Sequence, residues 1–112
     1  MPTTKAADIP ESVQQQVNEI VQKFNWRVIK DQSRYYATRF KGKYLYLDHA
    51  YLGRPERICR LKYNGQIDNW DFAIYKYSDG AYDADEWAFP GSNYIDGTLE
   101  GAMKAGLKAY PD

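Results

Sequence analysis

The sequence predicts an α+β fold: a helix, an antiparallel meander of five or six strands and a second helix. Apolar residues recur with a helical period near both ends of the chain and alternate with a period of two in between. Together these patterns favour a two-layer sandwich with both helices on one face of the sheet. The 112 residues, 44% of them hydrophobic, suit a single domain. We expect its first eight residues to form a loosely ordered tail.

The first predicted helix follows Pro10. Asp8 and Glu11 have the spacing of a capping box, and proline is tolerated in the first turn of a helix. The apolar residues of this segment fall on one helical face: Val13, Val17, Ile20, Val21 and Phe24. This stripe predicts a helix that packs against a core.

The second predicted helix lies near the end of the chain. Asp96 or Thr98 can cap its beginning, and Pro111 follows its end. Gly101 and Gly106 lower the intrinsic helix propensity, and their small size allows close approach to a sheet. Its apolar stripe has the same period as the first: Leu99, Ala102, Met103, Gly106, Leu107 and Tyr110.

Turn-forming residues divide the middle of the chain into short strands joined by hairpins. The predicted turns are Asp31–Ser33, Lys41-Gly42, Asn64-Gly65 and Asp79-Gly80. The predicted strands are 26–30, 35–40, 43–49, 57–63, 69–77 and, from a weaker pattern, 81–86.

The turns also predict which residues share a face of the sheet. A two-residue turn at Lys41-Gly42 pairs Phe40 with Lys43. A four-residue loop at 64–67 pairs Leu61 with Trp70 and places Arg60 beside Asp71. The face that we expect to carry the core contains Tyr36, Phe40, Leu45, Leu47, Cys59, Leu61, Tyr63, Trp70, Phe72 and Ile74.

The opposite face, which we call the tyrosine face, is the candidate binding site. It contains Tyr35, Arg39, Tyr44, Tyr46, Arg60, Lys62, Tyr75 and Tyr77. Tyrosine is a good strand residue whose ring can simply cover a sheet. Tyrosine and arginine are also enriched at protein interfaces, and rings beside cations bind single-stranded nucleic acid. We predict self-association, as a homodimer, or a protein partner, with nucleic acid as the alternative, which the nearby Asp48, Asp71, Asp79 and Asp83 weaken.

Charge is unevenly distributed although the net charge is zero. Residues 1–66 carry 12 Lys or Arg against 6 acids, and residues 67–112 carry 3 against 9. Such a split is found where one half of a chain binds an anionic partner. It is also expected where the two halves pack as neighbouring strands and neutralise each other, which is the interpretation we favour.

Few residues suggest catalysis, and we name no catalytic residue. His49 follows Asp48, but successive strand residues point to opposite faces, so a small enzyme that uses His49 is the least favoured alternative. Cys59 lies on the apolar face and is expected to be an inert buried thiol. One Cys and one His predict neither a disulfide nor a zinc site, and the acidic run at 79–86 lacks the pattern of a calcium loop. We therefore expect no cofactor and no metal.

The sequence around 58–63, 70–77, 82–90 and 97–102 resembles small uncharacterised bacterial proteins known only as domains of unknown function. The resemblance implies a bacterial hairpin-plus-helix domain and carries no activity, substrate or catalytic residue with it. No stretch approaches the ~20 apolar residues that span a bilayer, so no membrane partner is expected. The first eight residues lack the basic and apolar blocks of a signal peptide, which predicts a cytoplasmic protein.

Overall fold

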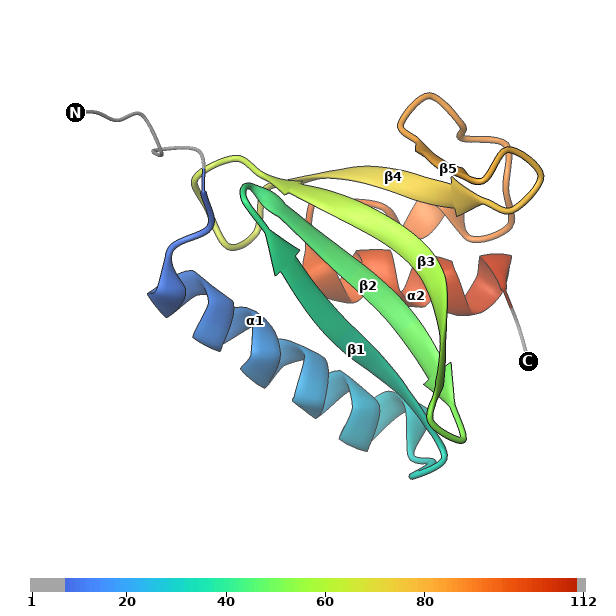
Figure 1. Cartoon of the computed structure of the whole chain (residues 1–112), viewed down its shortest axis with the longest axis horizontal. Coiled ribbons are helices and arrows are strands. Elements are labelled where there is room, and N and C mark those ends of the chain that lie inside the picture. Colours follow the sequence, from blue (N-terminus) through green and yellow to red (C-terminus); the bar gives the residue numbers. More distant parts are fainter. Residues whose placement is uncertain (1–7, 111–112) are drawn as a thin grey trace.

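The computed structural model describes residues 8–110 (Figure 1). Residues 1–7 of the predicted tail and Pro111 lie outside this range. The elements in chain order are α1 (Glu11–Phe24), the π-helix η2 (Asn25–Ile29), β1 (Arg34–Lys41), β2 (Tyr44–Tyr51), β3 (Arg54–Tyr63), β4 (Trp70–Lys76), β5 (Ala81–Asp83), the 3₁₀ helix η3 (Ser92–Tyr94) and α2 (Leu99–Ala109). The predicted α+β class is confirmed, with five antiparallel strands in the order β1-β2-β3-β4-β5.

One hydrophobic core joins the sheet to the helices. In Figure 1, α1 runs alongside β1, and α2 passes behind the middle of the sheet, where it contacts β3 and β4. The predicted alternation is confirmed, because the ten residues of the predicted core face are all buried in this core or packed against it. The most buried of its members are Leu45, Leu47, Leu61, Leu99, Met103, Val17 and Cys59. Burial raises the pKa of the Cys59 thiol, which keeps that group protonated and unreactive.

Tyr36 of β1 connects both helices to the sheet. Its ring packs edge-to-face on Phe24 of α1, with 5.9 Å between the ring centroids. Its hydroxyl donates a 2.7 Å hydrogen bond to the carbonyl oxygen of Met103 in α2. A Cβ on Gly106 would lie 2.4 Å from this hydroxyl oxygen and 2.6 Å from Cγ2 of Ile58. The expected role of Gly106 in close helix–sheet approach is therefore confirmed.

The start of α1 differs from the predicted capping box. Pro10 is the N-cap residue, in an extended conformation, and no side chain caps this end. The helix begins directly after Pro10, so Asp8 lies too far back to reach the first turn, and Ile9 instead enters the core. At α2 the prediction of Thr98 is confirmed, because its hydroxyl accepts a 3.0 Å hydrogen bond from the backbone N–H of Gly101.

The predicted strand at 26–30 is wrong, because this segment continues α1 as the π-helix η2. The backbone N–H of Lys30 donates to the carbonyl of Asn25, five residues earlier. The Asn25 side chain fixes the segment to β1, accepting from the N–H of Tyr36 at 2.8 Å and donating to its carbonyl at 3.1 Å. The helix ends at Lys30, which has a left-handed φ of 59°. Nothing between Phe24 and Lys30 breaks a helix, so the helical hydrogen bonds continue.

The β1–β2 register differs from the prediction by two residues. Lys41 lies opposite Tyr44, and Phe40 lies opposite Leu45 rather than Lys43. The turn consists of Gly42 and Lys43, because the positive φ of 60° that it needs falls on Gly42. A shift of two preserves the alternation, so every residue remains on its predicted face.

The β3–β4 register is shifted by two in the same way. Leu61 lies opposite Phe72 rather than Trp70, because the connecting segment runs from 64 to 69 and is longer than predicted. The predicted pair of Arg60 with Asp71 is wrong, since Asp71 lies opposite Lys62. The faces are again unchanged.

A β-bulge in β3 changes the alternation beyond it. Leu47 lies opposite Cys59, but the next residue, Asp48, lies opposite Arg57, which leaves Ile58 as the extra residue. Ile58 and Cys59 are therefore both buried. The bulge also returns Arg57 to the tyrosine face, where regular alternation would have placed Ile58.

Candidate interaction surface

The tyrosine face forms on one side of the sheet from residues of four strands. Its members are Tyr35 and Arg39 on β1, Tyr44 and Tyr46 on β2, Arg60 and Lys62 on β3, and Tyr75 on β4 with Tyr77 directly after it. Their strand partners agree with this placement, since Tyr46 lies between Arg39 and Arg60 and Tyr44 lies opposite Lys62. The structure thus brings the eight predicted residues to one surface.

The rings of this surface differ in exposure. Tyr77 is 51% exposed and Tyr35 is 38% exposed, whereas Tyr44 and Tyr46 are half-buried. Tyr75, at the centre, is only 7% exposed. The surface is therefore a packed layer of side chains with exposed rings at its margins, and not a row of free rings.

Arginine side chains cover the half-buried and buried rings. The Arg60 guanidinium lies 4.5 Å from the ring centroid of Tyr44, and that of Arg39 lies 4.9 Å from Tyr46. The Arg57 guanidinium lies 5.6 Å from the ring of Tyr75. These distances are typical of cation–π contacts, which hold the guanidinium planes in fixed positions over the sheet.

Arg39 is also bound to a carboxylate of its own chain. It donates to Asp48 through Nε at 2.6 Å and through a terminal nitrogen at 3.0 Å. The Asp48 side chain is 8% exposed, while that of Arg39 is 48% exposed. The hydrogen bonds to Asp48 raise the pKa of Arg39. Asp48 is consequently unavailable to a partner, and its charge cancels that of Arg39.

Three members of this surface were missed from the sequence: Lys41, which had been assigned to the turn, Arg57 and Tyr82. Tyr82 lies opposite Tyr75 on β5, with ring centroids 4.9 Å apart, and 5.3 Å from Tyr46. A four-residue loop around the Asp79-Gly80 turn would have predicted this pairing. For Arg57 the signal is the Ile58-Cys59 pair, since two successive apolar residues in an alternating strand indicate a bulge.

The tyrosine rings contact one another in a continuous row. Successive centroids are 6.3, 5.3, 4.9, 4.7 and 5.5 Å apart. The row runs Tyr44, Tyr46, Tyr82, Tyr75, Tyr77, Tyr110. It ends at α2, where the hydroxyl of Tyr110 donates to the carbonyl of Tyr75. The last three contacts of the row are edge-to-face and the first two are tilted, and together they restrict the rings before any partner binds.

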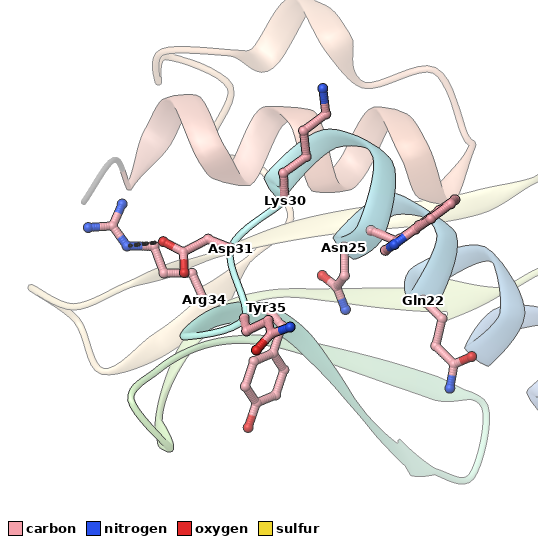
Figure 2. A pocket seen from close by; sticks show the side chains of 8 residues that line it. Gln22, Asn25, Lys30, Asp31, Arg34 and Tyr35 are labelled. Carbon is pink, nitrogen blue, oxygen red and sulfur yellow. Dashed lines mark ion pairs between the residues drawn. The ribbon is translucent and has the colours of Figure 1, made fainter.

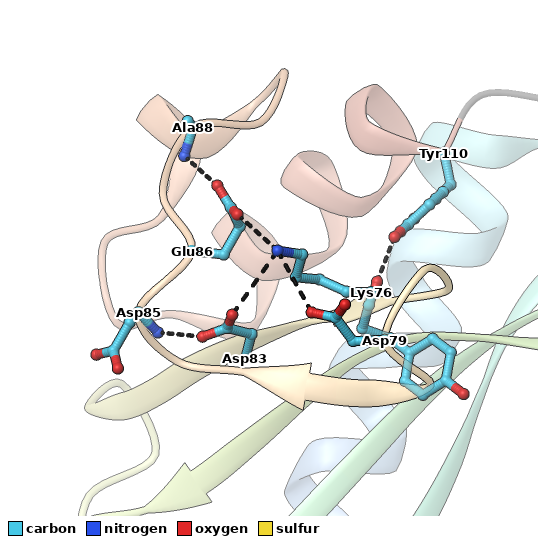
Figure 3. Close-up of polar contacts among 8 residues, drawn as sticks. Lys76, Asp79, Asp83, Asp85, Glu86, Ala88 and Tyr110 are labelled. Atoms are coloured by element: carbon cyan, nitrogen blue, oxygen red, sulfur yellow. Dashed lines mark hydrogen bonds and ion pairs between the residues drawn. The ribbon is translucent and has the colours of Figure 1, made fainter.

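Two of the four acids that were expected to offset the positive charge of this surface, Asp79 and Asp83, pair with Lys76 instead. Figure 3 shows Asp79, Asp83 and Glu86 around Lys76, with Nζ to carboxylate distances of 3.5, 3.9 and 3.0 Å. The hydrogen bond from Lys76 lowers the pKa of Glu86. Lys76 directly follows Tyr75 on β4, and successive strand residues point to opposite faces. The Lys76 side chain therefore lies on the face opposite the tyrosine face.

The tyrosine face therefore has an excess of positive charge. On the paired strands, five cations share it with two carboxylates, one of them the buried Asp48. The cations are Arg39, Lys41, Arg57, Arg60 and Lys62. Three of them, Arg39, Lys41 and Arg57, line a hollow of about 410 Å³ together with Phe40, Tyr46 and Tyr82. Because Arg39 is bound to Asp48, an anionic group in this hollow would face Lys41 and Arg57.

His49 lies away from this surface. The residue is 6% exposed, and its ring centroid lies 5.3 Å from that of Tyr36, on the core side of β2. Asp48 points to the tyrosine face, so it does not orient the imidazole. Among residues 8–110, no three His, Cys, Asp or Glu side chains are grouped closely enough to hold a metal ion. Within that range, no helix has the length and apolar character needed to cross a membrane.

Burial of the tyrosine hydroxyls predicts a loss of stability in alkali. Desolvation, and then the nearby Glu56 charge, raise the pKa of Tyr77 to about 12, and desolvation also raises the pKa of Tyr82 and Tyr110. An unfolded tyrosine ionises near pH 10. The raised pKa values contribute to the free energy of unfolding, and this contribution is fully present below pH ~10 and is lost between pH ~10 and ~12. We expect the tyrosinate absorbance contributed by these three residues to develop together with unfolding, and Tyr77→Phe to move unfolding to higher pH. Complete ionisation near pH 10 of a chain that stays folded would contradict this.

No family model, curated protein or solved structure matches this chain. The resemblance found in the sequence likewise transfers no function. The interpretation of the tyrosine face rests on its own geometry.

Proposed function

We propose that this chain is an interaction module that binds an acidic segment of a protein on its tyrosine face, and that the partner is a second copy of the chain. The compartment we propose is the bacterial cytoplasm. The observation that carries the proposal is the arrangement of Arg39, Arg57 and Arg60, each held over a tyrosine ring on a surface with excess positive charge.

Stacked guanidinium groups are well suited to bind carboxylates. A guanidinium that lies flat on a ring keeps its N–H groups at the edge, where they can form paired hydrogen bonds with a carboxylate. Because the stacking already restricts the Arg57 and Arg60 side chains, less conformational entropy is lost when a partner binds. Arg39 is occupied by Asp48, so Arg57, Arg60 and the neighbouring lysines provide the available charge.

This chain itself contains a segment of matching charge. Residues 76–86 carry Lys76 against four acids, an excess of three negative charges, which equals the positive excess of the tyrosine face. The acids are Asp79, Asp83, Asp85 and Glu86. In such an assembly the tyrosine face of one copy contacts the acidic segment of another, which is a head-to-tail contact. It forms a closed dimer or ring only if the rotation between neighbouring copies brings the last copy back to the first.

Single-stranded nucleic acid is the second candidate, supported by the positive excess. Base stacking, however, needs open ring faces. Guanidinium groups cover Tyr44, Tyr46 and Tyr75, and only Tyr35 and Tyr77 at the margins are more than one-third exposed. This arrangement favours carboxylates over bases.

The test uses two charge-reversal variants and light scattering. Arg57→Glu/Arg60→Glu removes the positive surface, and Asp79→Lys/Asp85→Lys removes the acidic one. We expect the unmodified chain to self-associate at low salt and each variant alone to be monomeric. An equimolar mixture should form a 1:1 complex, because each variant retains the surface that the other lacks.

Lys104→Glu/Lys108→Glu on α2 is the matched control, since it makes the same change in charge on exposed residues elsewhere and should leave association intact. A monomeric unmodified chain, or a mixture of variants that stays monomeric, would overturn the proposal. Binding of a single-stranded oligonucleotide by a monomer, with log affinity falling steeply against log salt, would assign the surface to nucleic acid instead.

A further inference from the structure

Exposed apolar side chains gather at one end of the molecule, remote from the acidic segment. Five of the eight large hydrophobic residues that are exposed within residues 8–110 lie in η2 or beside the two turns next to it. We call them the turn-end patch: Trp26, Val28, Tyr35, Tyr51 and Leu52. Trp26 is 77% exposed and Leu52 is 66% exposed, so neither side chain contributes much to the core.

Hydrogen bonds and packing join the two turns into one surface. The backbone N–H of Leu52 donates a 2.8 Å bond to the carbonyl of Ser33, which connects the β2–β3 turn to the turn before β1. Arg34 lies opposite Tyr51, with its guanidinium 5.0 Å from the ring centroid. Trp26, Arg34 and Tyr35 line a shared hollow of about 500 Å³. These contacts join η2, the turn before β1 and the β2–β3 turn at one end of the molecule.

The backbone of the β2–β3 turn does not explain the leucine at its tip. Leu52 has a φ of 52° and is followed by Gly53 with a φ of 80°. Turns with positive φ at both central residues favour Asn-Gly, and a leucine in this conformation is strained. Leu52 is therefore unfavourable in two ways: its positive φ strains the backbone, and its apolar side chain is exposed to water. Binding to an apolar environment would bury the exposed Leu52 side chain.

Cations surround the turn-end patch. Residues 25–35 and 50–54 contain four cations and one acid, Asp31. The cations are Arg27, Lys30, Arg34 and Arg54. Figure 2 shows Lys30, Arg34 and Tyr35 pointing outward in different directions, so they do not converge on a single small ligand. Divergent cations around an apolar tip match an extended anionic surface.

We propose that the turn-end patch binds the surface of an anionic lipid membrane. Trp26 and Leu52 would enter the boundary between headgroups and acyl chains, where tryptophan, tyrosine and leucine are favoured. The cations would lie at the level of anionic headgroups, where each contributes about 1 kcal/mol. Binding of this kind needs no spanning helix. It uses different arginines from the sheet surface proposed to bind acidic protein, and the two surfaces share only Tyr35 at their margins.

The experiment is flotation of the full chain with vesicles of phosphatidylcholine alone or with phosphatidylserine at about one lipid in four. We expect binding to the mixed vesicles only, with a blue shift of tryptophan emission. Trp26→Ser and Leu52→Asn should each weaken binding several-fold. Lys30→Gln should weaken it about five-fold, the equivalent of one surface cation.

Leu52→Asn keeps the test independent of folding, because asparagine suits the positive φ and should leave the melting temperature unchanged or higher. Trp87→Ser is the matched control: Trp87 is 48% exposed but lies outside the patch, so its loss should leave vesicle binding unchanged. The proposal is overturned if the unmodified chain does not bind, if it binds both vesicle types equally, or if Trp87→Ser reduces binding as much as Trp26→Ser.

Discussion

Leu61→Ala is expected to lower the free energy of unfolding by about 2–5 kcal/mol, the range found for leucine truncation in well-packed cores. Leu61 is 1% exposed and lies on β3 between Leu45 of β2 and Phe72 of β4. Strands on both sides hold its surroundings in place, so the core cannot collapse into the space that the smaller side chain leaves. The loss of apolar burial is then increased by the cost of a cavity.

Denaturant unfolding of the two chains measures this effect from the shift of the midpoint at constant slope. Leu52→Ala is the matched control, since it removes the same atoms from a leucine that is 66% exposed and should change stability by less than about 0.5 kcal/mol. Equal effects of the two substitutions would mean that Leu61 is not part of the core.

Arg39→Met is expected to cost about 1–3 kcal/mol, the penalty for leaving a buried polar group without its partner. The effect should be asymmetric. Removing the guanidinium leaves the Asp48 carboxylate, 8% exposed, without its two hydrogen bonds. Asp48→Asn leaves a neutral amide that can still accept from Arg39, whose side chain is 48% exposed and remains hydrated. The second substitution should therefore cost less than the first.

Thermal or denaturant unfolding of both variants at neutral pH, with the double variant completing the cycle, measures this asymmetry. A larger loss for Asp48→Asn than for Arg39→Met would show that the charge of Asp48 does something other than pair with Arg39.

The faces of the sheet could be predicted from the sequence, whereas the strand register could not. Alternation assigned Leu45, Leu61 and Phe72 to the core correctly even though both predicted registers were shifted by two residues. Face assignment depends only on parity, and a shift of two leaves parity unchanged. The register depends on which two residues form the turn, and Gly42 can be the second residue of a Lys41-Gly42 turn or the first residue of a Gly42-Lys43 turn.

The π-helix could not be predicted from local sequence patterns. Trp26, Val28 and Ile29 are residue types enriched in strands, yet they extend α1. The side chain of Asn25 bonds the backbone of Tyr36, eleven residues later, so a tertiary contact determines the local structure.

The candidate site was predicted as a surface but not in its detail. Parity placed the eight residues together, but a sequence does not show that Arg60 lies over Tyr44 or that Tyr75 is buried beneath its neighbours. Nor did it show that Asp83 binds Lys76. These contacts depend on side-chain directions that only the folded sheet provides.

The consecutive strand order has a consequence for how the chain folds during synthesis. Each strand pairs with the next, so every hairpin can form while the later residues are still unmade. The hydrogen bond between Tyr36 and Met103 cannot form this early, because Met103 follows Tyr36 by 67 residues. A chain that lacks α2 therefore carries a paired sheet whose apolar side is incompletely covered, the kind of intermediate that aggregates or recruits chaperones. A released chain truncated before residue 99 should aggregate, and one that extends through residue 109 should not.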